Sequence, residues 1–121
     1  MNTTTRQKGN FGEELSVKEL LNKGYRILER NFSSRYGEID IIAEHDNYII
    51  FVEVKLRKSI NNGYPKEAVN KSKQRKIILT AQEYIIKKNI QNRDFRFDVI
   101  EIIEGKEILF NHIKNAFWIE E

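Results

Sequence analysis

The stretches GEIDIIAE at residues 37–44 and YIIFVEVKL at residues 48–56 decide the fold of this 121-residue chain. Both are rich in isoleucine and valine, and the short segment HDN between them has the composition of a turn. The pattern predicts an antiparallel hairpin with a two-residue turn at 46–47, which pairs His45 with Tyr48. That register determines which side chains of the two strands lie opposite each other.

Helical periodicity and turn residues place the neighbouring elements. Before the hairpin, a helix is expected from an N-cap at Asn10 to a stop at Gly24, with residues 1–8 frayed. After the hairpin, Pro65 is expected at the first position of a long second helix that reaches about Lys88. The residues expected to face inward are Val17, Leu20 and Leu21 in the first helix and Ile78, Ala81 and Ile85 in the second.

Three further strand signals complete the pattern, at residues 26–31, 95–103 and 108–113. The resulting order, α-β-β-β-α-β-β, predicts an α/β fold with a mixed central sheet flanked by helices. A chain of this length is expected to form one domain over residues 1–121.

The composition restricts the possible classes of protein. The chain contains no cysteine, which excludes disulfides, cysteine-ligated zinc and thiol nucleophiles. No apolar stretch approaches the roughly 18 residues that a membrane span requires, and the first residues lack the apolar segment of a secretory signal. We therefore expect a cytoplasmic protein without a membrane partner.

A basic run, KEAVNKSKQRK at residues 66–76, stands out in a chain whose net charge is +3. Its only acidic residue is Glu67. Charge runs of this kind are usually solvated helix faces, and a surface that contacts phosphates is the less common alternative. The basic candidates for nucleic-acid contacts are Lys66, Lys71, Lys73, Arg75 and Lys76 in the run, and Arg57 and Lys58 before it.

The hairpin register also gathers acidic side chains on one face of the expected sheet. Because side chains alternate between faces along a strand, Asp40 is expected opposite Glu53, and Glu38 opposite Lys55. Two opposed carboxylates repel each other, so a proton, a cationic side chain or a metal ion must compensate them. Oxygen ligands without cysteine suit a hard cation such as Mg²⁺ or Mn²⁺. The alternative is a set of cross-strand salt bridges, above all between Glu38 and Lys55.

Glu13 has two interpretations. It lies four residues before Val17, which places its carboxylate on the inward stripe of the first helix. It also stands three residues after Asn10, which is the spacing of a capping box. Both interpretations hold together if the side chain turns inward.

Other motifs with chemical potential are sparse. No Ser-His-Asp order or phosphate-binding glycine loop is present, and His45 and His112 are predicted to be structural. Arg96 and Asp98 share a strand face and can pair with each other or with neighbouring residues. Trp118 is expected to pack in the core or at an edge, although an exposed aromatic near the basic run could stack on a base.

An acid on one strand, then Glu-x-Lys at the end of the paired strand, after a helix that carries an acid, resembles the core of the PD-(D/E)xK nucleases. That superfamily includes restriction endonucleases and archaeal Holliday junction resolvases. The chain is more closely similar to the bacterial YraN family of small resolvase-like proteins, over almost its entire length. The matching residues are Gly9, Gly12 and Glu13, Gly24 and Tyr25, Asn31, GEID at 37–40, FVEVKLR at 51–57, Gly63, Pro65, Ala68 and Val69, Lys73, Arg96 to Val99, and Asn115 to Phe117. One departure is Ile39, which precedes Asp40 where the superfamily's name has a proline.

The resemblance implies a restriction-endonuclease-like fold. It also implies a metal-dependent endonuclease that hydrolyses phosphodiester bonds in branched, flap or junction DNA. By carry-over at matching positions, Asp40 and Glu53 would ligate Mg²⁺ or Mn²⁺. Glu13 would bind the metal directly or through water, and Lys55 would orient the attacking water or stabilise the developing charge.

On the same resemblance, Lys73 or Gln74 contacts the scissile phosphate, while the basic run holds the phosphates on either side. Symmetric cutting of two strands needs two sites, so a homodimer is expected by analogy. Two alternatives remain: a nucleic-acid-binding module that keeps the nuclease fold without catalysis, and a protein-interaction domain whose acids form surface ion pairs.

Overall fold

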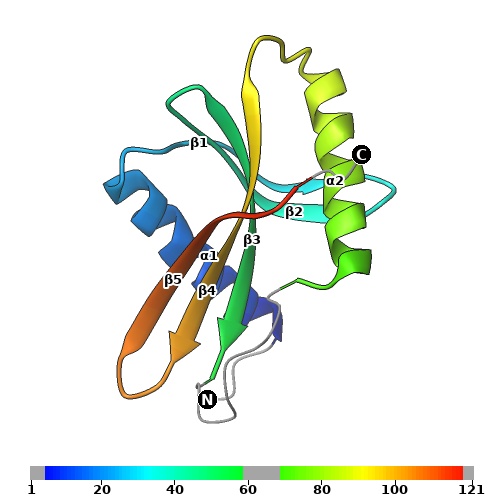
Figure 1. The fold of residues 1–121 in the computed structure, drawn as a ribbon. Coiled ribbons are helices and arrows are strands. Elements are labelled where there is room, and N and C mark those ends of the chain that lie inside the picture. The colour runs from blue at the N-terminus through cyan, green and yellow to red at the C-terminus, as the bar shows by residue number, and fades with distance from the viewer. Residues whose placement is uncertain (1–4, 59–68, 119–121) are drawn as a thin grey trace.

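The computed structural model describes residues 5–58 and 69–118, with side chains from residue 10 onward, and contains the elements in the predicted order (Figure 1). They are α1 (Thr5–Asn22), β1 (Arg26–Ser33), β2 (Glu38–His45), β3 (Tyr48–Arg57), α2 (Lys71–Lys87), β4 (Asp94–Glu104) and β5 (Ile108–Phe117). This order confirms the predicted α/β class. Within the described residues, neither helix is long and apolar enough to cross a membrane.

The five strands form one mixed sheet in the order β1-β2-β3-β4-β5. β3 and β4 are parallel, whereas the other three neighbouring pairs are antiparallel. Antiparallel neighbours can be joined by tight turns, but a parallel pair needs a crossover connection. α2 lies in that crossover and packs on one face of the sheet, while α1 packs on the other (Figure 1).

The alternation of side chains along β3 divides the hydrophobic core between the two faces. Phe51 belongs to the cluster under α2, whereas Ile50 and Val52 belong to the cluster under α1. Glu53 and Lys55 continue the face of Phe51 toward the end of the strand. The charged groups of β3 therefore lie on the side of the sheet that α2 covers.

The start of α1 differs from the prediction. The helix begins at Thr5, so the N-cap predicted at Asn10, and the capping box with it, is wrong. Packing explains why the helix passes through this position. A Cβ at Gly12 would lie 3.5 Å from Ile102 Cδ1, so this turn lies directly on the sheet, and such contacts outweigh a local start signal.

The end of α1 is where the sequence places it. Gly24 has a φ of +88°, in the left-handed region that favours glycine, and Tyr25 N donates to Leu20 O at 2.9 Å to close the helix. Leu20 is fully buried as predicted, but Leu21 is 53% exposed, so its assignment to the inward stripe is wrong. The stripe that meets the sheet includes Ser16 and Leu20, four residues apart, and Leu21 points away from it.

α2 begins later than predicted, at Lys71, and Pro65 lies outside the described residues. Asn70 is the N-cap, because its Oδ1 accepts a hydrogen bond from Lys73 N at 2.9 Å. The buried residues of α2 are Ile77, Thr80, Ala81 and Tyr84, with Ile78 and Ile85 half-buried at the edge. The predicted inward face was correct for Ala81 and displaced by one position elsewhere.

Asn70→Ala is expected to lower the free energy of unfolding by about 1 kcal/mol, because the Lys73 amide loses its capping acceptor. Asn70→Asp retains an acceptor oxygen and is expected to stay close to the wild type. Urea titration of the three proteins measures the difference. An alanine variant as stable as the aspartate variant would show that the cap contributes nothing.

Candidate active site

The register of the central hairpin is the predicted one. His45 pairs with Tyr48, and the ladder continues to Ile41, which pairs with Val52. At the next residue of β2, Asp40, a side chain takes the place of the backbone acceptor. Asp40 Oδ2 accepts a hydrogen bond from Val54 N at 2.8 Å. Asp40 is thereby fixed at the point where β2 and β3 separate.

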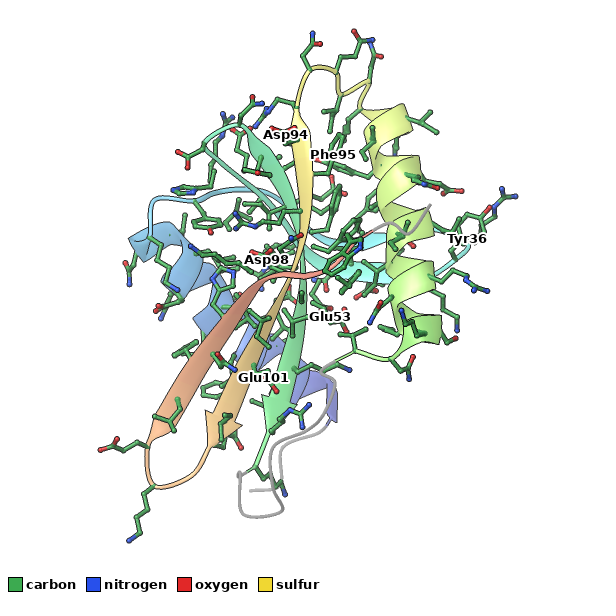
Figure 2. All side chains as sticks on the ribbon, viewed as in Figure 1. Tyr36, Glu53, Asp94, Phe95, Asp98 and Glu101 are labelled. Carbon is green, nitrogen blue, oxygen red and sulfur yellow. The ribbon has the colours of Figure 1, made fainter. Side chains whose placement is uncertain are left out.

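Glu53 lies next to this point, on the α2 side of β3 (Figure 2). Its side chain is buried, and its Oε1 lies 3.9 Å from Lys55 Nζ of the same strand. Lys73 Nζ, from the first turn of α2, lies 3.7 Å from the same oxygen. The structure therefore brings one cation from β3 and one from α2 to a single buried carboxylate.

The two lysines do not fully neutralise the negative charge of Asp40 and Glu53. Burial, followed by the adjacent Asp40 carboxylate, raises the pKa of Glu53 to about 7, although Lys73 and Lys55 act in the opposite direction. Burial also raises the pKa of Asp40, and the negative charges of Glu13 and Glu38 add to this effect. At neutral pH, the pair must therefore either retain a proton or take up a cation.

Glu13 faces this site from α1, as the inward interpretation predicts. Its side chain is buried, but its Oε1 already accepts hydrogen bonds from Arg30 Nε at 2.9 Å and Asn31 Nδ2 at 3.0 Å. Glu13 and Asp40 both line a pocket of about 200 Å³ between α1 and the ends of β2 and β3. Within the described residues, no group of three acids or histidines is close enough to hold a metal ion. The structure thus brings Asp40 and Glu53 together and places Glu13 nearby, in contact with Arg30.

The salt bridge expected between Glu38 and Lys55 is absent from the described part of the chain. Glu38 Oε2 instead accepts a hydrogen bond from Ser33 Oγ at 3.3 Å, and Lys55 turns toward Glu53. The strands separate at Asp40, so residues beyond it no longer face each other as an ideal ladder would require. The alternative interpretation, a set of cross-strand salt bridges, therefore lacks the ion pair on which it mainly depended.

Arg57, a predicted phosphate contact, is held by an acid that the sequence interpretation missed. Arg57 Nε lies 2.8 Å from Glu101 Oε2, and Asn111 Nδ2 donates to Glu101 Oε1 at 3.0 Å. Figure 2 shows Glu101 on β4, beside the end of β3. Its sequence signal was the same as that of Glu53, an acid within an apolar strand. Lys58 is exposed just after β3.

The remaining predicted contacts lie in the first turns of α2. Lys73 meets Glu53, as described above, and Gln74 Nε2 donates to Val69 O at 2.8 Å, so this side chain braces the helix start. Lys71, Arg75 and Lys76 are exposed on α2. Lys66 lies outside the described residues.

A second charged cluster lies on the opposite face of the sheet, under α1. The predicted pair of Arg96 and Asp98 is confirmed, with an Nε–Oδ1 distance of 2.8 Å. His112 Nε2 donates to Asp98 Oδ2 at 2.7 Å, and His45 stacks on Tyr25 with ring centroids 4.3 Å apart. Both histidines thus make packing or hydrogen-bond contacts away from the acidic pair.

The donor set of the acidic pair fits a hard divalent cation. Two carboxylates converge in a setting that raises the pKa of both, and hard cations prefer oxygen ligands of this kind. Lys55 lies beside the pair and can hold an anionic group there. The arrangement can therefore combine cation binding with stabilisation of negative charge.

The comparisons with known proteins agree with the motifs. Residues 12–102, which include the four site residues Glu13, Asp40, Glu53 and Lys55, match the model of the uncharacterised protein family UPF0102. A relative from Persephonella marina is 53% identical over 91% of this chain and 92% of its own length. One from Clostridioides difficile is 53% identical over 93% and 97%, and one from a Sulfurihydrogenibium species is 48% identical over 94% and 96%. The chain therefore belongs to the UPF0102 family, the YraN family that its motifs indicated.

Proposed function

We propose that this protein is a divalent-metal-dependent endonuclease that hydrolyses phosphodiester bonds in structured DNA, such as branches, flaps or junctions. One observation carries the proposal: Asp40 and Glu53 converge where β2 and β3 separate, with Lys55 beside them. Family membership is consistent with this role but assigns no activity.

In this proposal, Asp40 and Glu53 hold Mg²⁺ or Mn²⁺. Glu13, whose Oε1 is already bonded to Arg30 and Asn31, would act through a bridging water. When bound, such an ion polarises a phosphate oxygen and lowers the pKa of a coordinated water. The positive charge would also relieve the repulsion that raises the pKa of the two acids.

The lysines would act on the phosphate and the nucleophile. Lys55 lies within reach of both the acidic pair and any phosphate placed against it, so it orients water and stabilises the developing negative charge. Lys73 approaches the same carboxylate from α2 and would hold a non-bridging phosphate oxygen. Both side chains come from regular elements, a strand and a helix, which fixes their relative position.

The exposed cations on α2, together with Lys58, would hold the phosphates on either side of the cut. Contacts of this kind position a nucleic acid without reading its sequence. Selection by shape therefore fits this surface better than selection by base sequence. A second copy of the chain would supply the second cut that symmetric cleavage of a junction requires.

A second candidate is a nucleic-acid-binding module that keeps this fold without catalysis. It is favoured by the contacts of Glu13 with Arg30 and Asn31, which occupy the oxygen that a third ligand would offer. On this alternative, Lys55 and Lys73 serve only to neutralise Glu53. The two candidates predict the same binding but different fates for the substrate.

An assay of metal-dependent cleavage distinguishes the endonuclease from the non-catalytic binding module. The wild type with Mn²⁺ is expected to cut at least one substrate in a panel of labelled four-way junctions, flaps and linear duplexes. Lys55→Ala is expected to cut it on the order of 100-fold more slowly, because the group that stabilises the developing charge is removed. Lys106→Ala removes an exposed lysine from the β4–β5 turn, outside the acidic pair and its lysines, and is the matched control. If the protein retards every substrate on a gel and leaves all of them intact, the binding module is the correct function.

A further inference from the structure

Asn31 departs from regular strand backbone inside β1. Its φ of 55° lies in the left-handed region, which asparagine tolerates better than most residues but which a regular strand does not contain. The ladder between β1 and β2 pairs Arg30 with Ile41, and the same register resumes beyond Asn31. Because the two strands are antiparallel, the next residues along them, Asn31 and Asp40, lie opposite each other. The irregular residue is therefore a neighbour of one acid of the candidate active site.

The left-handed backbone turns the Asn31 side chain toward Glu13. Consecutive side chains of a regular strand point to opposite faces of the sheet. Arg30 and Asn31 are consecutive, yet Arg30 Nε and Asn31 Nδ2 both donate to Glu13 Oε1, at 2.9 and 3.0 Å. The φ of Asn31 accounts for this arrangement, because it breaks the alternation between the two side chains. The irregular backbone thus provides a second donor to the Glu13 carboxylate.

The two donors to Glu13 differ in charge and in their other contacts. Arg30 Nη1 also lies 2.7 Å from Glu14 Oε1, so the positive charge of Arg30 is shared between two acids. Asn31 is neutral, so its amide holds Glu13 without cancelling the negative charge that attracts a cation. Glu13, Asn31 and Asp40 line the same pocket, and the charge of Glu13 contributes to the raised pKa of Asp40. Asn31 therefore fixes one acid of this pocket close to another.

We propose that Asn31 is a positioning residue of the candidate active site, which holds the Glu13 carboxylate beside Asp40 so that both acids serve the same divalent cation. This inference rests on the cation site of the proposed function. The contact between Asn31 and Glu13 would then support the site, because a carboxylate held in this way can still meet a cation through a coordinated water. Residues that orient the groups around a metal commonly change its affinity by about 10- to 100-fold when they are mutated.

The alternative is that Asn31 only shapes the backbone of β1, which is an edge strand. Irregular residues at sheet edges are common, because they prevent pairing with a strand of another chain. That role requires the left-handed backbone and does not require the amide. Glycine adopts the left-handed region without steric cost. Asn31→Gly therefore separates the two roles, since it keeps the backbone conformation and removes the donor to Glu13.

Calorimetric titration of the full chain with Mn²⁺ tests the inference. Asn31→Gly is expected to bind Mn²⁺ about tenfold more weakly than the wild type, because Glu13 is no longer held at the site. Asn92→Gly is the matched control, since Asn92 is an exposed asparagine with a φ of 60° in the connection between α2 and β4. It is expected to bind Mn²⁺ as the wild type does. Circular dichroism in EDTA checks that both variants retain the fold.

A double-mutant cycle tests whether Asn31 acts through Glu13. Glu13→Gln alone is expected to weaken Mn²⁺ binding by about tenfold, because it removes the carboxylate itself. The combination of Glu13→Gln with Asn31→Gly is expected to cause no further loss, since the group that Asn31 holds is already gone. A role of Asn31 that is confined to the backbone would not produce this coupling.

Three results would overturn the inference. They are equal Mn²⁺ affinities of Asn31→Gly and Asn92→Gly, losses that add in the double variant, and the absence of Mn²⁺ binding by the wild type. The last result would also remove the metal-dependent function. The other failures are separable: cleavage by the wild type with unchanged Mn²⁺ affinity in Asn31→Gly keeps the nuclease and removes the role of Asn31. Weaker Mn²⁺ binding by Asn31→Gly without cleavage of any substrate keeps that role and removes the nuclease.

Discussion

Asp98→Asn is expected to lower the free energy of unfolding by about 3–5 kcal/mol at neutral pH, because it leaves Arg96, whose side chain is only 14% exposed, without its counter-charge. The Asp98 side chain is fully buried. Its carboxylate accepts two hydrogen bonds from Arg96, at 2.8 and 2.9 Å, one from His112 at 2.7 Å, and one from Asn115 N at 2.9 Å. An asparagine in this place offers one acceptor oxygen and turns an amide toward groups that are themselves donors.

The pKa of Asp98 shows that its partners dominate the local energetics. Burial alone would raise this pKa, but the hydrogen bonds from His112, Arg96 and Asn115 outweigh burial and hold it below its usual value. A depressed pKa in the folded state means that this contribution is present above the pKa of the unfolded chain and is lost as the pH falls through the folded value. The difference between wild type and variant should therefore narrow in acid.

Asp46→Asn is the matched control. Asp46 carries the same substitution at a side chain that is 82% exposed, and its φ of 54° lies in the left-handed region that asparagine tolerates. Its free energy of unfolding is expected to stay within about 0.5 kcal/mol of the wild type. Chemical denaturation of the three proteins at neutral pH makes the comparison. Equal stability of the two variants would mean that the cluster around Asp98 carries no net energy.

The strands and the register of the hairpin were predictable because their signals are local. The two-residue turn fixes which residues face each other, and the observed pairing of His45 with Tyr48 follows from that rule. The same rule predicted that Asp40 lies beside Glu53, and in the structure the Asp40 carboxylate is close enough to raise the pKa of Glu53. Period-two alternation survives packing because a slip of one residue would expose an entire apolar face.

The helix starts were less predictable because packing decides them. α1 extends through Asn10 as Gly12 packs directly on the sheet, and no local property of the sequence reveals that contact. At α2, Pro65 was the predicted start, whereas the described helix begins at Lys71 with Asn70 as its N-cap. Local propensity is only a weak guide when several starts are available.

Partners of the site residues depend on contacts between elements that are distant in sequence. Glu13 is bonded to Arg30, which the sequence interpretation did not consider. Arg57 was assigned to phosphates and instead meets Glu101 across the parallel pair of β3 and β4. The parallel register depends on the crossover through α2, and no hairpin rule supplies it. The acidic pair was therefore predictable from local signals, whereas the ion pairs around it were not.

Glu53→Gln is expected to stabilise the metal-free protein at about pH 8 while making it insensitive to divalent cations. Burial, and then the charge of Asp40, raises the pKa of Glu53 from an ordinary value of 4.5 to about 7. Between these two values, the folded protein retains a proton that the unfolded chain has released, so the free energy of unfolding falls as the pH rises. The full difference corresponds to about 3 kcal/mol, which a neutral glutamine at this position recovers.

The pH profile of unfolding in EDTA tests the sign. The wild type should lose stability between about pH 5 and pH 8, whereas Glu53→Gln should show a flatter profile and should match the wild type only at the acidic end. Glu107→Gln, at an exposed turn position, should follow the wild type throughout. Mg²⁺ added at about pH 8 should raise the midpoint of the wild type and leave Glu53→Gln unchanged, because a cation bound to the folded state alone stabilises it by mass action. A less stable Glu53→Gln variant at about pH 8 would show that Lys55 and Lys73 already compensate the pair, and the reason for a cation at this site would be gone.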